Sequence, residues 1–149
     1  MMTGRCMYRV EDEYSQARTT TGKGVVAADV KSWVDFRARQ NYKRTQLTRH
    51  FRNHINWSNR TKTPFISTYD DYQTAYEEAL RRKRRGRKNV TIIIIDIGRA
   101  GHRVEYRNVR RLAETLECWI PNRAWNNSEF EYIFLHRIPA RAVIDVIKL

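Results

Sequence analysis

The segment from Val90 to Ile97 constrains the fold more than any other part of the chain, because it is nearly all β-branched and apolar. Its apolar side chains occupy both alternating sets of positions, whereas a half-exposed strand alternates apolar and polar residues. β-branched residues also favour an extended backbone. The run therefore predicts a central strand that is buried on both faces and anchors the core.

Two other segments have helical periodicity. Between Thr45 and Trp57, apolar side chains recur every four residues at Leu47, Phe51 and Ile55, which predicts one buried helical face. From Tyr72 onward, apolar residues follow the spacing of an amphipathic helix, with Asp70 or Asp71 as its cap and Gly86 at its end. In this second helix, Glu77 with Arg81 and Glu78 with Arg82 are spaced to form ion pairs. Two further helices are expected, one over a stretch containing Val30, Trp33 and Val34, and a short one over Val109, Leu112, Ala113 and Leu116.

The remaining segments read as strands and loops. A strand over Cys6 to Val10 leads into a Ser-, Thr- and Gly-rich stretch from Ser15 to Gly24, which predicts a long mobile loop. Phe65 to Thr68 is a short extended segment, and Pro121 to Ser128 is a loop. Strands are expected at Glu131 to Leu135 and Val143 to Ile147, joined through Ile138-Pro139. Strands and helices without regular alternation predict an α+β class.

Length and charge limit the kind of protein. The 149 residues suit one domain, 1–149, because no long polar linker divides the chain. Lys and Arg number 29 against 16 Asp and Glu, and the net charge of +13 favours anionic partners such as a nucleotide, a nucleic acid or an acidic protein surface, or simply keeps the chain in solution. The two cysteines are too few for a disulfide framework, although a single bridge stays open.

Apolar runs are short throughout the sequence. The longest, Ile92 to Ile95, falls far short of the ~20 residues that a membrane-spanning helix needs. The N-terminus also has no apolar signal-peptide core. We therefore expect a soluble domain without a membrane partner; a secreted effector and a nuclear or cytoplasmic protein both remain open, as does the oligomeric state.

Three short segments carry groups suited to one reaction. Cleavage of the bond between a ribose and a cationic pyridinium passes through an oxocarbenium-like transition state, which a carboxylate such as Glu131 can stabilise. Arg9 suits a pyrophosphate, because its planar donors bind phosphate oxygens in pairs. Ser67 and Thr68 can fasten neighbouring strands and hold the carboxylate by hydrogen bonds. Each group lies at or beside the edge of an expected strand, so one fold can bring them into a single cleft.

These residues carry a family resemblance. Their order, Tyr8-Arg9, Phe65-Ile66-Ser67-Thr68 and Glu129-Phe130-Glu131, resembles the Arg, Ser-Thr-Ser, Glu-x-Glu signature of the cholera-toxin-like ADP-ribosyltransferases. The sequence is most similar to the heat-labile-enterotoxin A-chain type, in Tyr8 to Asp12 and in Ile138-Pro139 after Glu131, and it also resembles fungal domains related to these toxins. The resemblance implies an ADP-ribosyltransferase fold, with two small packed β-sheets around an NAD cleft and flanking helices.

The resemblance also implies roles. Arg9 would hold the NAD phosphate and the active-site frame, Ser67 and Thr68 would brace the nicotinamide-ribose pocket, and Glu131 would be the catalytic carboxylate. Glu129 would lie on the same side of an extended chain as Glu131, because strand side chains alternate. A glutamate there is typical of family members that modify arginine. NAD would be the substrate, with no metal, and ADP-ribose would pass to an acceptor, first a protein arginine and second a nucleic acid.

Two positions depart from the family pattern and keep alternatives open. Tyr69 replaces the last serine of Ser-Thr-Ser, and the bulky Phe130 separates the two glutamates. NAD hydrolysis, with water as acceptor, is a rival within enzymes. A catalytically inactive basic module that binds nucleic acid or protein is a rival from another class, for which Tyr69 is the sequence hint.

A basic run, two histidines and several aromatic residues each have a purely structural and a functional interpretation. The run from Arg81 to Lys88 is either the solvated end of a helix, whose dipole favours positive charge, or a contact for nucleic acid or an acidic target. His50 and His54 are spaced four apart as in some zinc sites, but no third ligand follows, which favours partly buried helix residues. Aromatic side chains that could stack on NAD or reach the cleft are Tyr14, Trp57, Trp119 and Trp125.

Overall fold

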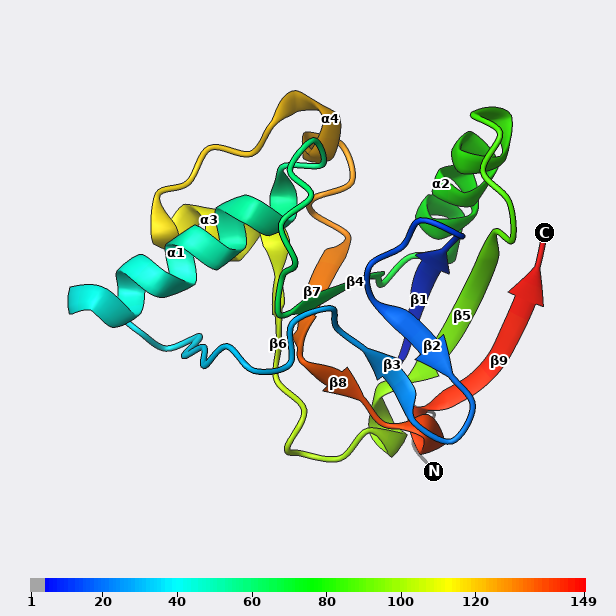
Figure 1. The fold of residues 1–149 in the computed structure, drawn as a ribbon, viewed down its shortest axis with the longest axis horizontal. Coiled ribbons are helices and arrows are strands. Elements are labelled where there is room, and N and C mark those ends of the chain that lie inside the picture. Colours follow the sequence, from blue (N-terminus) through cyan, green and yellow to red (C-terminus); the bar gives the residue numbers. More distant parts are fainter. Residues whose placement is uncertain (1–4) are drawn as a thin grey trace.

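The computed structural model describes residues 5–149 and contains nine strands and four α-helices within them (Figure 1). The strands are β1 Cys6–Glu11, β2 Arg18–Thr20, β3 Gly24–Val26, β4 Phe65–Tyr69, β5 Thr91–Asp96, β6 Tyr106–Asn108, β7 Glu131–Leu135, β8 Arg137–Ile138 and β9 Val143–Lys148. The helices are α1 Asn41–Ile55, α2 Tyr72–Arg84, α3 Val109–Leu116 and α4 Asn122–Trp125, with 3-10 turns at Ile97–Arg99 and Ala140–Ala142.

The strands form two antiparallel sheets. The larger has six strands in the order β6-β7-β4-β1-β5-β9, and the smaller has three in the order β2-β3-β8. As predicted, β5 is an inner strand, and its Ile92, Ile93 and Ile95 are almost completely buried. The predicted α+β class with two small sheets is confirmed.

The two faces of β4 meet different layers. Ile66 packs with Val25 and Ile138 of the small sheet, on one face of the large sheet. On the other face, Phe65 packs into the cluster under α1 and α3, and Tyr69 packs into the cluster under α2. Ser67 shares this second face and lies between the two helical groups. Figure 1 shows α1 and α3 together at one end of the molecule and α2 at the other, with strands between them.

Helix α2 begins and ends where its sequence signals predict. The Asp71 carboxylate accepts the Thr74 backbone N–H at 3.0 Å, so Asp71 is the N-cap. Gly86 follows the helix with φ +85°, a backbone conformation that glycine adopts at little cost. The expected Glu78–Arg82 pair forms at 2.9 Å. The Glu77 carboxylate instead accepts from Gln73, and Arg81 pairs with Glu78.

Three segments differ from the sequence-based expectations. Val30 to Val34 is not helical, because the Asp29 carboxylate accepts the backbone N–H groups of Lys31 and Ser32 and so stabilises a turn. The expected loop from Ser15 to Gly24 contains β2, since its β-branched threonines pair with β3. The expected loop from Pro121 to Ser128 contains the single turn of α4.

Within residues 5–149 the structure answers whether the two cysteines form a disulfide and whether any helix could span a membrane. Cys6 and Cys118 are both free thiols. No helix in this part of the chain combines the length and apolar character required to cross a membrane.

The hairpin of the small sheet yields a stability prediction. Gly24 has φ +81°, and a Cβ there would overlap the backbone of Ile138 and lie 2.6 Å from the Ala140 nitrogen. Gly24→Ala is therefore expected to destabilise the protein by roughly 2–4 kcal/mol, through strain and overpacking. Gly22→Ala is the matched control, because Gly22 has φ +83° with no atom within 4 Å of an added Cβ. Equal midpoints of the two variants in urea unfolding would contradict the close approach.

Candidate active site

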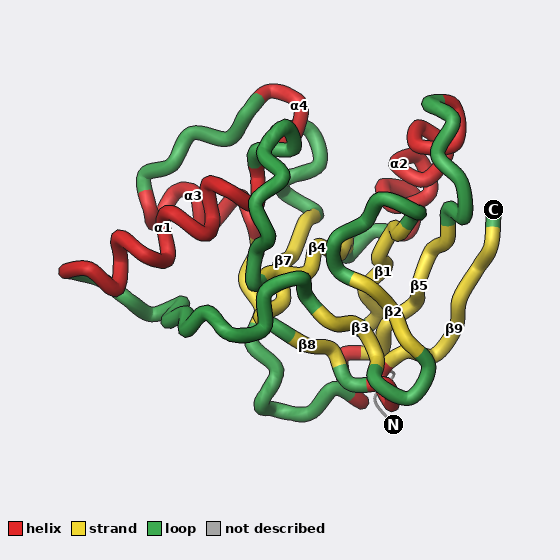
Figure 2. The backbone as a smooth tube through the Cα atoms, viewed as in Figure 1, coloured by secondary structure: helices red, strands yellow, loops and turns green. Residues whose placement is uncertain are grey.

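A cleft of about 300 Å³ opens between the two helical groups and is lined by Arg9, His54, Trp57, Ser67, Tyr69 and Arg82, among others. Two loops form its mouth, one after β1 and one between α1 and β4. They are joined where the Gln16 side chain donates to the Arg60 carbonyl at 3.0 Å. Figure 2 shows both loops passing between the helical groups.

Arg9 is buried beneath this cleft, with 5% of its surface exposed. Its Nε donates to the Glu11 carboxylate at 3.1 Å, and its two Nη atoms donate to the carbonyls of Ser67 and Ala17 at 3.1 and 2.9 Å. Burial lowers the pKa of Arg9, and the charge of Glu11 opposes that shift. Arg9 thus ties β1 to β4 and to the chain before β2.

Ser67 faces the cleft and contacts a histidine that the sequence analysis did not assign to the site. The Ser67 hydroxyl lies 2.7 Å from Nε2 of His54, whose Nδ1 lies 2.6 Å from the Thr63 hydroxyl. Burial, followed by the charge of Arg9, lowers the pKa of His54 to about 4. The imidazole is therefore neutral at neutral pH, held between two hydroxyl groups.

Glu131 opens β7 directly opposite Tyr69 of β4, and 5% of its surface is exposed. Burial raises the pKa of Glu131 to about 7, and the charge of Glu78 adds to the rise. The adjacent Ser67 side chain and the charge of Arg82 lower that pKa in turn. Ser67 thus lies between Arg9, which donates to its carbonyl, and Glu131, which is beside its side chain.

Thr68 and Glu129 lie elsewhere. Thr68 is on the opposite face of β4, fully buried, and its hydroxyl donates to the Tyr132 carbonyl at 3.0 Å, which fastens β4 to β7. The expectation that Glu129 shares a strand face with Glu131 is wrong. Glu129 is exposed in the turn before β7, where its carbonyl accepts from Asn108, so strand alternation does not apply to it.

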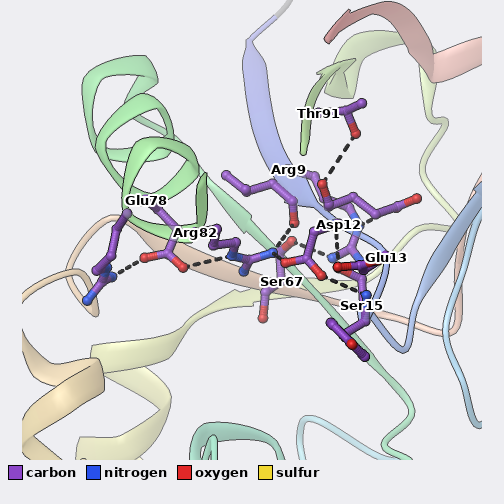
Figure 3. Close-up of polar contacts among 12 residues, drawn as sticks. Arg9, Asp12, Glu13, Ser15, Ser67, Glu78, Arg82 and Thr91 are labelled. Carbon is purple, nitrogen blue, oxygen red and sulfur yellow. Dashed lines mark hydrogen bonds and ion pairs between the residues drawn. The ribbon is translucent and has the colours of Figure 1, made fainter. Parts of the chain in front are cut away.

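The basic run at the end of α2 is only partly solvated. Arg82 donates to Glu78 at 2.9 Å and to Asp12 at 3.1 Å, and both acids are buried (Figure 3). The Glu13 backbone N–H donates to the Lys88 carbonyl at 3.1 Å. These contacts fix the loop after β1 against α2, so that part of the run forms a wall of the cleft.

The sequence contains features that could have assigned some further residues to the cleft. His54 is three positions after Phe51 and next to Ile55, which places it beside the buried face of α1. Tyr14 and Trp57 line the cleft, whereas Trp119 is 72% exposed and Trp125 stacks under Arg110 outside it. Across residues 5–149, no group of three or more His, Cys, Asp or Glu side chains is placed to share a metal ion.

The fold has a counterpart among solved structures. The chain is similar to a structure named EcPltA, with a TM-score of 0.58 and 12% sequence identity over 98% of this chain and 76% of that chain. The six-stranded and three-stranded sheets with their helices match the ADP-ribosyltransferase fold of the pertussis-like toxins. The chain itself belongs to the family described as "Domain of unknown function (DUF7587)", whose model matches residues 2–149. No curated protein sequence matches it.

Proposed function

We propose that this chain is a single-domain NAD-dependent mono-ADP-ribosyltransferase, which transfers ADP-ribose from NAD to an acceptor and releases nicotinamide. The observation that carries the proposal is that Arg9 and Glu131, which lie 122 positions apart in the sequence, are both adjacent to Ser67, a residue that lines the cleft. The ADP-ribosyltransferase fold supports NAD as the substrate.

Glu131 is the proposed catalytic carboxylate. Loss of nicotinamide leaves positive charge on the ribose, and a negative group stabilises that charge most strongly where water is excluded. Glu131 is buried, so its ionised form meets little competition from solvent. Ser67 orients this carboxylate, and the neutral His54 orients Ser67 in turn.

Arg9 has mainly a framing role in this proposal. Three of its N–H groups are already taken by Glu11, Ser67 and Ala17, which leaves at most two for a phosphate oxygen. Thr68 supports the frame from the opposite face of β4, through its bond to β7.

The acceptor has two candidates at this stage. A protein arginine is the first by family resemblance, through Glu129, and a nucleic acid is the second through the net charge of +13. The exposed position of Glu129 weakens the first candidate, because that carboxylate lies in a turn outside the strand that carries Glu131.

The test follows both products of the reaction. Purified protein is incubated with NAD labelled in its adenosine part, together with a cell extract, and free nicotinamide and labelled macromolecules are measured. Transferase activity predicts both products, whereas release of nicotinamide with only free labelled ADP-ribose would identify an NAD hydrolase. Absence of nicotinamide release together with absence of NAD binding would remove the proposal.

The rate of nicotinamide release is also expected to depend on pH. The reactive form of Glu131 is the carboxylate, and its pKa is about 7 in the protein without NAD. Because the ionised fraction of such a group increases from pH 6 to pH 8, kcat/KM for NAD, which reports the groups of the free enzyme, is expected to rise about tenfold over that range. His54, with a pKa of about 4, stays neutral throughout the same range. A rate that is flat or falls between pH 6 and pH 8 would contradict this assignment.

A further inference from the structure

Positive charge without an acidic partner gathers at the mouth of the cleft. Arg60, Arg85, Arg87 and Arg123 line it, and no acidic side chain within residues 5–149 pairs with any of them. They come from three separate segments: the loop after α1, the turn after α2, and α4. We call these four residues the arginine rim.

The acids of the cleft do not neutralise this rim. Asp12 and Glu78 are both buried and both are held by Arg82. Arg9 is matched by Glu11. The rim therefore keeps a net positive charge, whereas the pyrophosphate of NAD supplies only two negative charges, which is fewer than the four arginines present.

Aromatic and amide side chains lie beside the rim. Tyr14 is 56% exposed, and the Cζ of Arg87 lies 4.4 Å from the centroid of its ring. The Cζ of Arg81 lies 5.7 Å from the centroid of the Trp57 ring. Asn53 and Asn59 line the same cleft and are joined by a hydrogen bond of 3.0 Å. Arginines that hold phosphates, with aromatic rings on which bases stack, are the combination that binds single-stranded nucleic acid.

We propose that the acceptor of this enzyme is a single-stranded nucleic acid, with phosphates held by the arginine rim and an unpaired base turned into the cleft. This inference rests on the proposed transferase function and names its acceptor class. A duplex does not fit the role, because its bases are stacked and their amino groups paired. A protein arginine would bring further positive charge to a rim that is already positive, and so would be repelled.

The reaction balances without another reagent. A lone pair on an exocyclic amino nitrogen of the base forms a bond to C1′ of the nicotinamide ribose. The bond from C1′ to the pyridinium nitrogen breaks, and its electron pair stays with nicotinamide, which leaves as a neutral molecule. The amino group then loses one proton to solvent.

The first test measures binding without catalysis. A fluorescein-labelled single strand of mixed sequence, about 12 nucleotides long, is titrated with protein in the absence of NAD. The triple variant Arg60→Ala, Arg85→Ala and Arg123→Ala is expected to bind at least about tenfold more weakly, and the slope of log affinity against log salt is expected to fall by about 2. The matched control removes the same charge at Arg39, Arg49 and Arg103, which are exposed and outside the cleft.

Several outcomes would overturn the inference. Equal affinity of the two triple variants would show that net charge alone attracts the strand. Displacement of the strand by saturating NAD would assign the rim to the dinucleotide. Binding of a duplex as tight as that of the single strand would argue against an unpaired base as acceptor.

The second test identifies the labelled product. With adenosine-labelled NAD, the wild type is expected to label the single strand in a nuclease-sensitive and protease-resistant product, and the control triple variant to do the same. Nicotinamide release with label only on protein would overturn the acceptor class and leave the transferase standing. Absence of nicotinamide release in every mixture would instead reject the transferase itself.

Discussion

Glu131→Gln is expected to lower the rate of nicotinamide release from NAD by roughly 100- to 1000-fold, because it removes the negative charge opposite the developing cation of the ribose. Glutamine has the same shape as glutamate and can still bond with Ser67, so the change isolates the charge. Glu114→Gln is the matched control, since Glu114 is exposed on α3. The rate is measured at saturating NAD and pH 8, where the Glu131 carboxylate, with its pKa of about 7, is mostly ionised.

Stability separates this effect from misfolding. The pKa of Glu131 is raised to about 7 from an ordinary value of 4.5, so the folded wild type holds its proton more tightly than the unfolded chain does. The wild type therefore loses stability as pH rises from about 4.5 to 7. Glu131→Gln escapes that loss and is expected to be more stable than wild type by roughly 1–3 kcal/mol at pH 8, with little difference at pH 4.

The two measurements move in opposite directions, which makes the assignment testable. A variant that is more stable at pH 8 and nearly inactive is expected from a buried catalytic carboxylate. Equal rates in wild type and variant would remove the catalytic assignment. A variant less stable than wild type at pH 8 would contradict the burial of charge at this position.

Elements with strong local signals could be predicted from the sequence. Five of the six residues from Val90 to Ile95 are β-branched and apolar, and their position on and beside an inner strand buries four of them, all except Ile94. Helix α2 was predictable because its apolar spacing, its Asp71 cap and its terminal Gly86 agree. The stretch around Val30 and Trp33 lacked such agreement, and there the hydrogen bonds of Asp29 to the backbone decided the local structure.

Only those residues of the candidate site that belong to a recognisable sequence motif could be predicted. The order of the motifs in the chain predicts Arg9, Ser67 and Glu131, and the fold places both Arg9 and Glu131 beside Ser67. His54 belongs to no such motif, because its meaning depends on where Thr63 and Ser67 lie in space. The position of Glu129 could not be predicted from alternation either, since it depends on where β7 begins.

Charges that pair over long distances in the sequence were also beyond sequence reasoning. The helical spacing predicts the pair of Arg82 with Glu78, but it gives no sign of the second pair, with Asp12. The partner Asp12 is 70 positions away, and only the packing of α2 on β1 brings the two together. The arginine rim becomes visible for the same reason, because it consists of the arginines of the cleft that remain when Arg9 and Arg82, which pair with acids, are set aside.

Arg9→Ala is expected to destabilise the protein by about 3–5 kcal/mol, because it leaves one half of a buried ion pair without its partner. The Glu11 carboxylate would keep only the Thr19 backbone and hydroxyl as donors, and the carbonyls of Ser67 and Ala17 would lose theirs. Arg99→Ala is the control, since it removes the exposed pair with Asp96, at 3.8 Å, and is expected to cost less than about 1 kcal/mol.

A double variant distinguishes framing from charge. Arg9→Met with Glu11→Gln removes both charges, so it is expected to recover much of the stability that Arg9→Ala loses, as found when buried ion pairs are replaced together. Nicotinamide release should nevertheless stay low in the double variant, because methionine cannot donate to the Ser67 carbonyl. Without that bond β4 is not held in place, and the Ser67 side chain is no longer positioned beside Glu131. Urea unfolding and the rate with saturating NAD measure the two effects. Recovery of both stability and activity would show that Arg9 has no positioning role.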